Sequence, residues 1–229
     1  SLSSLVIPDS VTRIGDSAFR GCTSLSSLVI PDSVNIGFET FRGCESLTDI
    51  IIHASSSGVA NSVFKGCFFL SYIGHHVNIV LPDGITSIGD GAFSDCCSLS
   101  SLVVPGSVVN LKGNPFCRWD GELKCLSPYF IYDNKVLFDK DKSKIIAFRD
   151  QDTTSYVIPD YVTSIGDSAF EDCKSLKSLV IPDGVTSIGD GAFDNCCSLT
   201  DIVLPDSVTC IEDSAFSFCE SLTSIAIPD

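Results

Sequence analysis

Apolar and polar residues alternate along short segments of the chain, and the same arrangement returns every 23 residues. Each unit reads roughly L-x-x-L-x-I-P-D-x-V-T-x-I-G-D-x-A-F-x-x-C, and Pro182, Pro205 and Pro228 mark one position of this repeat. A fixed period of this length predicts a solenoid, because a unit can bury its apolar side chains only against the matching side chains of its neighbours.

Within a unit, the apolar spacing predicts two short strands. Leu28 and Ile30 lie on one side of an extended segment that ends at Pro31, because proline cannot donate to a strand ladder. In the second segment of the first unit, Ile14 and Phe19 face the same interior. Stacked in register, these strands would form parallel ladders about 4.8 Å apart around a narrow apolar core.

The repeat is strongly interrupted at one place. The step from Phe116 to Phe170 is 54 residues long, which is one repeat plus 31 residues. We therefore expect repeats at 1–119, a β-hairpin insertion at 120–153, and repeats again at 154–229. Both ends fall inside a repeat, so we expect the chain to be a fragment of a longer protein.

The I-P-D and I-G-D-x-A-F strings recur together at one spacing, and they resemble the BspA-type, or Treponema pallidum-type, leucine-rich repeat. The resemblance covers all of the chain except the insertion, which is itself similar to a segment that often interrupts such arrays. His53, Gly106 and Trp119 depart from the pattern. The resemblance implies a leucine-rich repeat solenoid with parallel β ladders. It also implies a non-enzymatic binding protein, exposed at the cell surface or secreted, that often acts as an adhesin.

The outward positions of the first strands are the candidate protein-binding face. They flank the inward leucine or isoleucine and form one mostly small polar row and one β-branched row. The face comprises Ser27, Val29, Asp49, Ile51, Ser101, Val103, Ser178, Val180, Asp201 and Val203. Contiguous exposed apolar residues tend to mark interaction sites. The alternative is that stacked valines simply favour strand pairing.

The chain is acidic, with 14 basic and 29 acidic side chains and a net charge of −15. This charge argues against nucleic acid or an anionic membrane as the main partner. The insertion is locally basic through Lys135, Lys140, Lys142, Lys144 and Arg149. Either these side chains only solvate hairpin turns, or they form a contact element for an acidic partner or for the acidic body of a second copy.

An aspartate follows most of the repeat prolines and most of the I-G pairs. One interpretation is that these carboxylates cap turns by accepting backbone N–H groups. The other is that calcium bridges the coils, because this ion binds several oxygens. The segment 139–143 is spaced like the start of an EF-hand loop, but Lys144 replaces the glycine that this loop requires. We expect no cofactor.

The chain has 12 cysteines, and seven of them occupy one column, three residues after the phenylalanine. At a core position, cysteine acts as a small hydrophobic residue. Cys117 and Cys125 lie near the root of the insertion and are the first choice for a disulfide, with Cys197 and Cys210 the second. No paired C-x-x-C arrangement indicates zinc.

Catalytic motifs are lacking in the sequence. The histidines are His53 and the adjacent His75 and His76, and no G-x-S-x-G, Walker or G-x-G-x-x-G string occurs. No apolar run has transmembrane length. We therefore expect a protein-protein recognition module that is not an enzyme, with the alternative of an architectural subunit in a larger assembly. Contacts with further repeats of its own chain or with another subunit are also expected.

Overall fold

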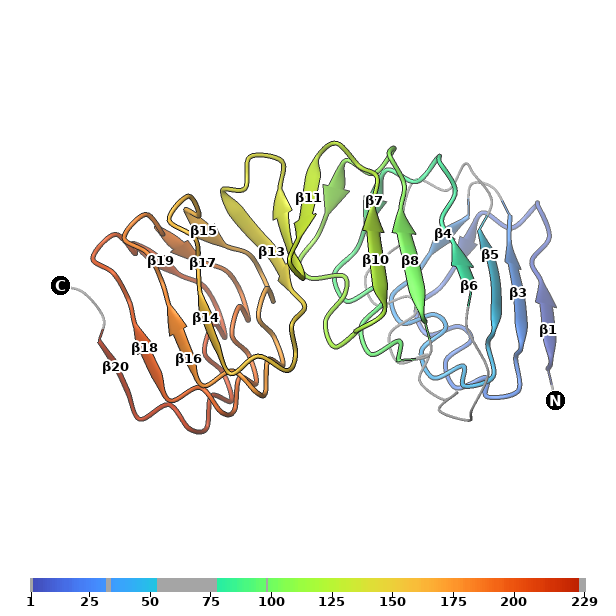
Figure 1. The fold of residues 1–229 in the computed structure, drawn as a ribbon. Coiled ribbons are helices and arrows are strands. Elements are labelled where there is room, and N and C mark those ends of the chain that lie inside the picture. Colours follow the sequence, from blue (N-terminus) through green and yellow to red (C-terminus); the bar gives the residue numbers. More distant parts are fainter. Residues whose placement is uncertain (1, 32–33, 53–77, 98, 227–229) are drawn as a thin grey trace. The chain divides into compact units, whose positions relative to one another are not determined.

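The computed structural model describes residues 2–31, 34–52, 78–97 and 99–226 (Figure 1). They form two compact units, Ser1–Tyr129 (unit 1) and Phe130–Asp229 (unit 2), and each is described by itself. The repeat arc at 53–64, the histidines and Cys67 lie outside the described residues. Across the described residues, no helix has the length and apolar character needed to cross a membrane.

Unit 1 is a β-solenoid in which equivalent strands of successive coils pair in parallel. Its first strands are β1 (Ser4–Val6), β3 (Ser27–Ile30), β5 (Asp49–Ile52), β6 (Asn78–Val80), β8 (Ser101–Val104) and β10 (Glu122–Cys125). Its second strands are β2 (Arg13–Ile14), β4 (Asn35–Ile36), β7 (Ser87–Ile88) and β9 (Asn110–Leu111). The register places Leu5 beside Leu28 and Leu28 beside Ile50, so that equivalent repeat positions become neighbours.

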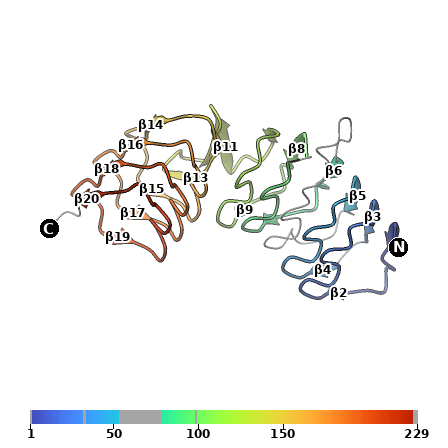
Figure 2. The ribbon, with the colours of Figure 1, turned by 90° about the horizontal axis from the view of Figure 1, so that it is seen from below.

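Unit 2 repeats this arrangement (Figure 2). Its first strands are β14 (Ser155–Val157), β16 (Ser178–Val180), β18 (Asp201–Val203) and β20 (Ser224–Ala226). Its second strands are β15 (Ser164–Ile165), β17 (Ser187–Ile188) and β19 (Cys210–Ile211). The sheet of second strands also contains three strands from the insertion, which are β11 (Phe130–Asp133), β12 (Val136–Asp139) and β13 (Lys144–Phe148). The predicted solenoid with parallel ladders is confirmed.

Two strands of the insertion, β10 and β13, pair with strands of the repeats. Strands β11, β12 and β13 pair antiparallel as the predicted hairpin, and β13 then pairs parallel with β15. At its other end, β10 pairs parallel with β8. Strands β10 and β13 both lie within residues 120–153, so parallel pairing with the repeats continues into the predicted insertion at both of its ends. The division of the chain at residues 119 and 154 stays a prediction.

In the core, side chains from the same repeat position of successive coils stack on one another. The rings of Phe170 and Phe193 stack with their centroids 5.1 Å apart, as do those of Phe193 and Phe216. The first two rings are fully buried, whereas Phe216 in the last described coil is only partly buried. Because each coil covers the next, burial falls where a coil has a described neighbour on one side only.

Phe148 is a member of this column that the sequence pattern did not reveal. Its ring stacks on that of Phe170 at 4.8 Å, and its backbone N–H donates to Ala169 O at 2.8 Å. Phe170 makes the same bond to Ala192 O at 2.8 Å. The long step from Phe116 to Phe170 therefore contains an additional core phenylalanine, and β13 supplies it.

Four of the six described column cysteines, Cys44, Cys96, Cys173 and Cys196, are buried in the core as predicted, whereas Cys22 and Cys219 are half-buried. Cys44 and Cys196 are buried, and each Sγ donates to the carbonyl of the preceding coil's phenylalanine, at 3.2 Å for Phe19 and 3.1 Å for Phe170. Trp119 takes the cysteine position in its coil, is buried, and donates from Nε1 to Leu99 O at 2.6 Å. Burial raises the pKa of Cys44 to about 11, which keeps this thiol protonated as a donor.

The aspartate of the I-G-D string connects coils. Asp16 Oδ1 accepts the backbone N–H of Phe38 at 2.9 Å, and Asp90 Oδ1 accepts that of Asn114 at 2.9 Å. These two carboxylates do accept backbone N–H groups, but each N–H belongs to the next coil, so these bonds are not the local capping of the aspartate's own turn that the sequence predicted. The turns after the prolines close differently, through a backbone bond such as Val162 N–H to Pro159 O at 3.0 Å.

This carboxylate explains the glycine of the same string. A Cβ built on Gly189 would lie 2.6 Å from Asp167 N, and closer still to Asp167 Oδ1. Gly37 is crowded in the same way by Asp16. The glycine is needed because the preceding coil's aspartate occupies the space of a side chain.

We predict that Gly189→Ala destabilises the protein by about 1–3 kcal/mol, because the added methyl must displace the Asp167 backbone or carboxylate. Urea denaturation followed by circular dichroism measures this change. Gly15→Ala is the matched control, because a Cβ at Gly15 meets nothing within 4 Å. Equal unfolding midpoints for the two variants would contradict the proposed crowding.

We also predict that the column cysteines resist alkylation in the native state. Iodoacetamide should modify the exposed Cys97 and Cys210 at pH 8, and Cys44 and Cys196 at least about tenfold more slowly until urea is added, because alkylation needs an accessible thiolate. Peptide mass spectrometry measures each rate. Native labelling of Cys196 as fast as Cys210 would refute the burial.

The raised pKa of the Cys44 thiol predicts how the stability of the protein depends on pH. Folding raises the pKa of Cys44 from the ordinary thiol value of 9.0 to about 11, so its contribution is complete below the unfolded value and is lost as pH rises through the folded value. The free energy of unfolding should therefore fall between these two pH values, and less steeply in Cys44→Ala. Urea midpoints at several pH values test this. Identical pH profiles of the two proteins would show that Cys44 makes no such contribution.

Candidate functional site

The first strands of unit 1 carry the candidate face as the period-two alternation predicts. Ile51 and Val103 are exposed, at 51% and 43%, whereas Leu28 and Leu102 between the outward positions are buried. Val29 is half-buried, and it is thus less accessible than its neighbours in the row. The same row includes the exposed Val6 and Val80. Unit 1 therefore presents β-branched residues at equivalent outward positions of two sheets, β1-β3-β5-β6 and β8-β10.

The polar row of unit 1 is partly engaged within the ladder. Asp49 and Ser101 are exposed, and Ser27 is half-buried. The Ser27 hydroxyl donates to the Ser4 hydroxyl of the preceding coil at 3.1 Å. Such a bond holds neighbouring coils together, so the serines serve the ladder as well as presenting a polar edge.

Unit 2 presents the same two rows. Val157, Val180 and Val203 are paired directly in the ladder and are 65%, 56% and 70% exposed. Asp201 is exposed beside them, and Ser178 is half-buried. The predicted face residues of unit 2 lie together on one sheet, whereas those of unit 1 are divided between the β1-β3-β5-β6 and β8-β10 sheets. Whether they bind a partner stays a prediction.

Strand β10 extends the face of unit 1 in a way that sequence reasoning missed. Glu122 pairs with Ser101, and Lys124 pairs with Val103. The apolar row therefore ends at a lysine. The signal was present in the sequence, because Glu122-Leu123-Lys124-Cys125 alternates polar and apolar residues with Leu123 buried.

The predicted basic element is largely neutralised by the protein itself. Lys135 pairs with Asp150 at 2.8 Å, and Lys142 pairs with Asp133 at 2.9 Å. A hydrogen bond to its aspartate raises the pKa of each lysine. Arg149 is buried, with its guanidinium 5.4 Å from the Tyr132 ring centroid and an N–H donated to Tyr132 Oη at 2.8 Å.

Lys140 and Lys144 are exposed and are not among the residues of any described ion pair. The element therefore offers three exposed lysines, of which Lys135 is already paired with Asp150 and Lys140 and Lys144 lie outside the described ion pairs. Its role in meeting an acidic partner stays a prediction.

Two tyrosines adapt the repeat to the insertion. Tyr161 replaces the serine or glycine found at this position in most other repeats, packs on Phe138 with centroids 6.2 Å apart, and lies beneath Lys142. Tyr156 replaces the inward leucine and packs on Phe148 at 4.6 Å. Burial raises the pKa of Tyr156 to about 12. These departures from the repeat were the sequence signal that the insertion docks here.

The predicted disulfide stays a prediction. Cys117 is buried, and Cys125 is half-buried with its Sγ 4.0 Å from Ser127 O. Burial raises the pKa of the Cys125 thiol. The second-choice pair stays a prediction in the same way: Cys197 and Cys210 are thiols in the structure, as Cys117 and Cys125 are, and Cys210 Sγ donates to Glu212 Oε1 at 3.0 Å.

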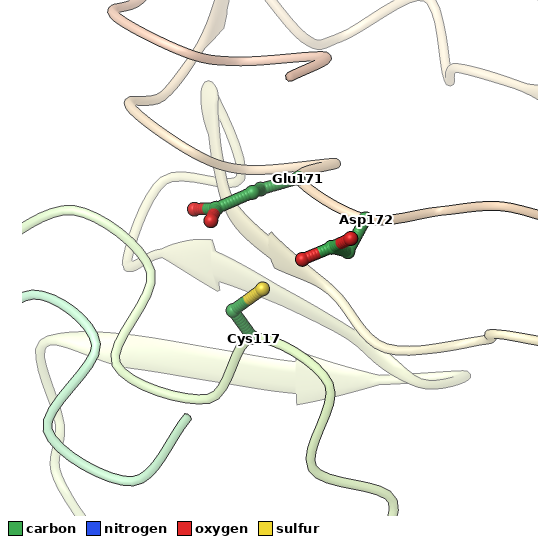
Figure 3. A group of neighbouring side chains, drawn as sticks. All are labelled: Cys117, Glu171 and Asp172. Carbon is green, nitrogen blue, oxygen red and sulfur yellow. The ribbon is translucent and has the colours of Figure 1, made fainter. Parts of the chain in front are cut away.

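Figure 3 shows Glu171 and Asp172, which belong to unit 2, together with Cys117 of unit 1. Within unit 2, Asp172 accepts from the Asn195 amide at 2.5 Å and pairs with Lys174 at 3.0 Å. This carboxylate is therefore engaged in linking one coil to the next.

Several solved bacterial structures are similar to the chain. A leucine rich cell surface protein from Faecalibacterium prausnitzii A2-165 is 27% identical with a TM-score of 0.61, over 99% of this chain and 73% of that one. A leucine-rich repeat protein from Eubacterium ventriosum ATCC 27560 is 21% identical with a TM-score of 0.71, over 99% and 73%. The pneumococcal vaccine antigen PcpA is 21% identical with a TM-score of 0.63, over 99% and 62%. The last two likenesses concern the fold alone.

A search of curated protein sequences gives no match. The family model for the BspA type leucine rich repeat region matches six copies, over residues 1–121 and 144–229. The matched residues include the ladders and the stacked core described above and omit most of the antiparallel hairpin. The chain therefore belongs to the BspA-type leucine-rich repeat family.

Proposed function

We propose that this protein is a non-enzymatic protein-protein recognition module of the cell surface or of a secreted, adhesin-like protein. The observation that carries the proposal is the row of exposed β-branched side chains on each first-strand ladder. Solvent exposure of Val157, Val180 and Val203 is unfavourable for a protein that has no use for these side chains at its surface.

The family and its neighbours support the proposal. Leucine-rich repeat proteins of this family bind other proteins, and the fold is typically non-enzymatic. The similar protein from Faecalibacterium prausnitzii is described as a cell surface protein, which supports the same location for this chain. The adhesin role is the more specific part of the proposal, and binding of a captured partner tests it.

We predict that Val103→Asp with Val180→Asp weakens the affinity for a captured protein partner by at least about tenfold. A charge placed in each row must be desolvated when a partner covers it. The partner is first isolated by cross-linking to the wild-type protein and identified by mass spectrometry. Its dissociation constant for each variant is then measured by surface plasmon resonance.

The matched control is Val109→Asp with Phe218→Asp, which adds the same charges at exposed apolar positions outside the first strands of the two units. Asp suits the left-handed backbone of Phe218, whose φ is 52°. If the first double variant is folded and binds as tightly as the wild type, the valines serve only strand pairing and the proposed face is wrong. A partner that copurifies in fixed stoichiometry would instead favour an architectural subunit.

A further inference from the structure

Exposed carboxylates follow the valine row of unit 2, three residues after the valine in each coil. Asp160, Asp183 and Asp206 each follow the proline that comes after a first strand, and all three are exposed. Each is the second residue of a turn closed by a valine N–H donated to the proline carbonyl, at 3.0, 3.1 and 3.0 Å. Identical turns on stacked coils give the carboxylates the same repeat as the valines.

We propose that these two rows together bind a cationic polypeptide segment. We name the surface the valine–aspartate face and define it by Val157, Val180, Val203, Asp160, Asp183 and Asp206. Apolar side chains of the partner cover the valines, and its lysine or arginine side chains pair with the aspartates. This inference rests on the proposed recognition function and specifies the chemistry of the partner.

The charges of unit 2 leave these aspartates for an external cation. Residues 154–229 carry two basic and 13 acidic side chains, and residues 130–153 of the same unit add five of each. In the described ion pairs of unit 2, Lys174 pairs with Asp172, Lys142 with Asp133 and Lys135 with Asp150. Within the described residues, the three aspartates of the face have no ion-pair partner. A cationic segment is therefore electrostatically complementary to this ladder.

A metal ion fits the face less well than a polypeptide does. Among the described residues, none of the three aspartates belongs to a group of three potential metal ligands whose atoms lie within 4.8 Å of one another. Calcium needs six to eight converging oxygens, whereas separate ammonium or guanidinium groups match separate carboxylates. A metal ion would also leave the valine row uncovered. Only a partner with both apolar and cationic side chains satisfies both rows.

The two rows should contribute differently to binding. Exposed ion pairs contribute little each, and salt screens them over a Debye length of about 8–10 Å. Burial of the valines supplies a term that salt does not weaken. Binding should therefore require apolar residues in the partner and should also lose affinity as ionic strength rises.

The test uses fluorescein-labelled synthetic peptides and the whole chain. A peptide of alternating Val and Lys should bind, as measured by fluorescence anisotropy, and should bind more weakly at about 300 mM than at about 50 mM salt. Peptides of alternating Val and Glu, or of alternating Ser and Lys, should bind at least about tenfold more weakly. Equal binding of all three peptides would overturn the proposal.

The variant Asp160→Asn, Asp183→Asn, Asp206→Asn should lose at least about tenfold in affinity for the Val and Lys peptide. Its matched control, Asp152→Asn, Asp213→Asn, Glu220→Gln, removes the same charge from exposed positions outside the face and should bind like the wild type. Circular dichroism confirms that both variants are folded. If the control loses as much affinity, only overall charge acts and the proposal is wrong.

Two further outcomes separate this inference from the proposed function. If Val103→Asp with Val180→Asp loses the protein partner but the triple aspartate variant keeps its peptide affinity, the recognition function stands and the cationic partner is wrong. If sedimentation shows salt-sensitive dimers of the wild type that the triple variant abolishes, a second copy occupies the face and a separate cationic polypeptide is rejected as its ligand.

Discussion

The structure depends on the coil-to-coil register, in which each repeat position stands directly on its counterpart. The bond from Phe170 N–H to Ala192 O and the stacking of the Phe170 and Phe193 rings express this register in backbone and side chain. A slip of one residue would turn Val180 inward and Leu179 outward, because side chains alternate along a strand. The core and the outer rows therefore follow from one constraint.

The register also explains how the array accommodates an insertion. The chain leaves the solenoid after β10 and rejoins it at β13, where Phe148 fills a place in the phenylalanine column. The next coil adapts through Tyr156 and Tyr161, whose rings pack against insertion residues. The extra segment is thus tied to the core by aromatic contacts, and two of its lysines are paired with aspartates of the same segment.

The repeat also determines which apolar and charged side chains line the surface. A position that is outward in one coil is outward in all, so a single valine in the repeat becomes an apolar row and a single aspartate becomes an acidic row. Such rows present an extended surface and not a pocket, which suits another polypeptide better than a small molecule. The exposed insertion residues Lys140 and Lys144 break this uniformity at one place.

The sequence by itself determined the solenoid, the burial of the phenylalanine and cysteine columns, and the outward rows, because each depends only on the repeat and the alternation along strands. The tertiary structure decided what depends on contacts between coils. Asp16 bonds to Phe38 N–H of the next coil, and Ser168 has a left-handed φ of 53° while its N–H donates to Asp190 O of the next coil. The structure alone also showed the stacking of Phe148 on Phe170 and the ion pairs of Lys135 and Lys142. Nothing in the local sequence specifies which residue of a neighbouring strand each of these side chains contacts.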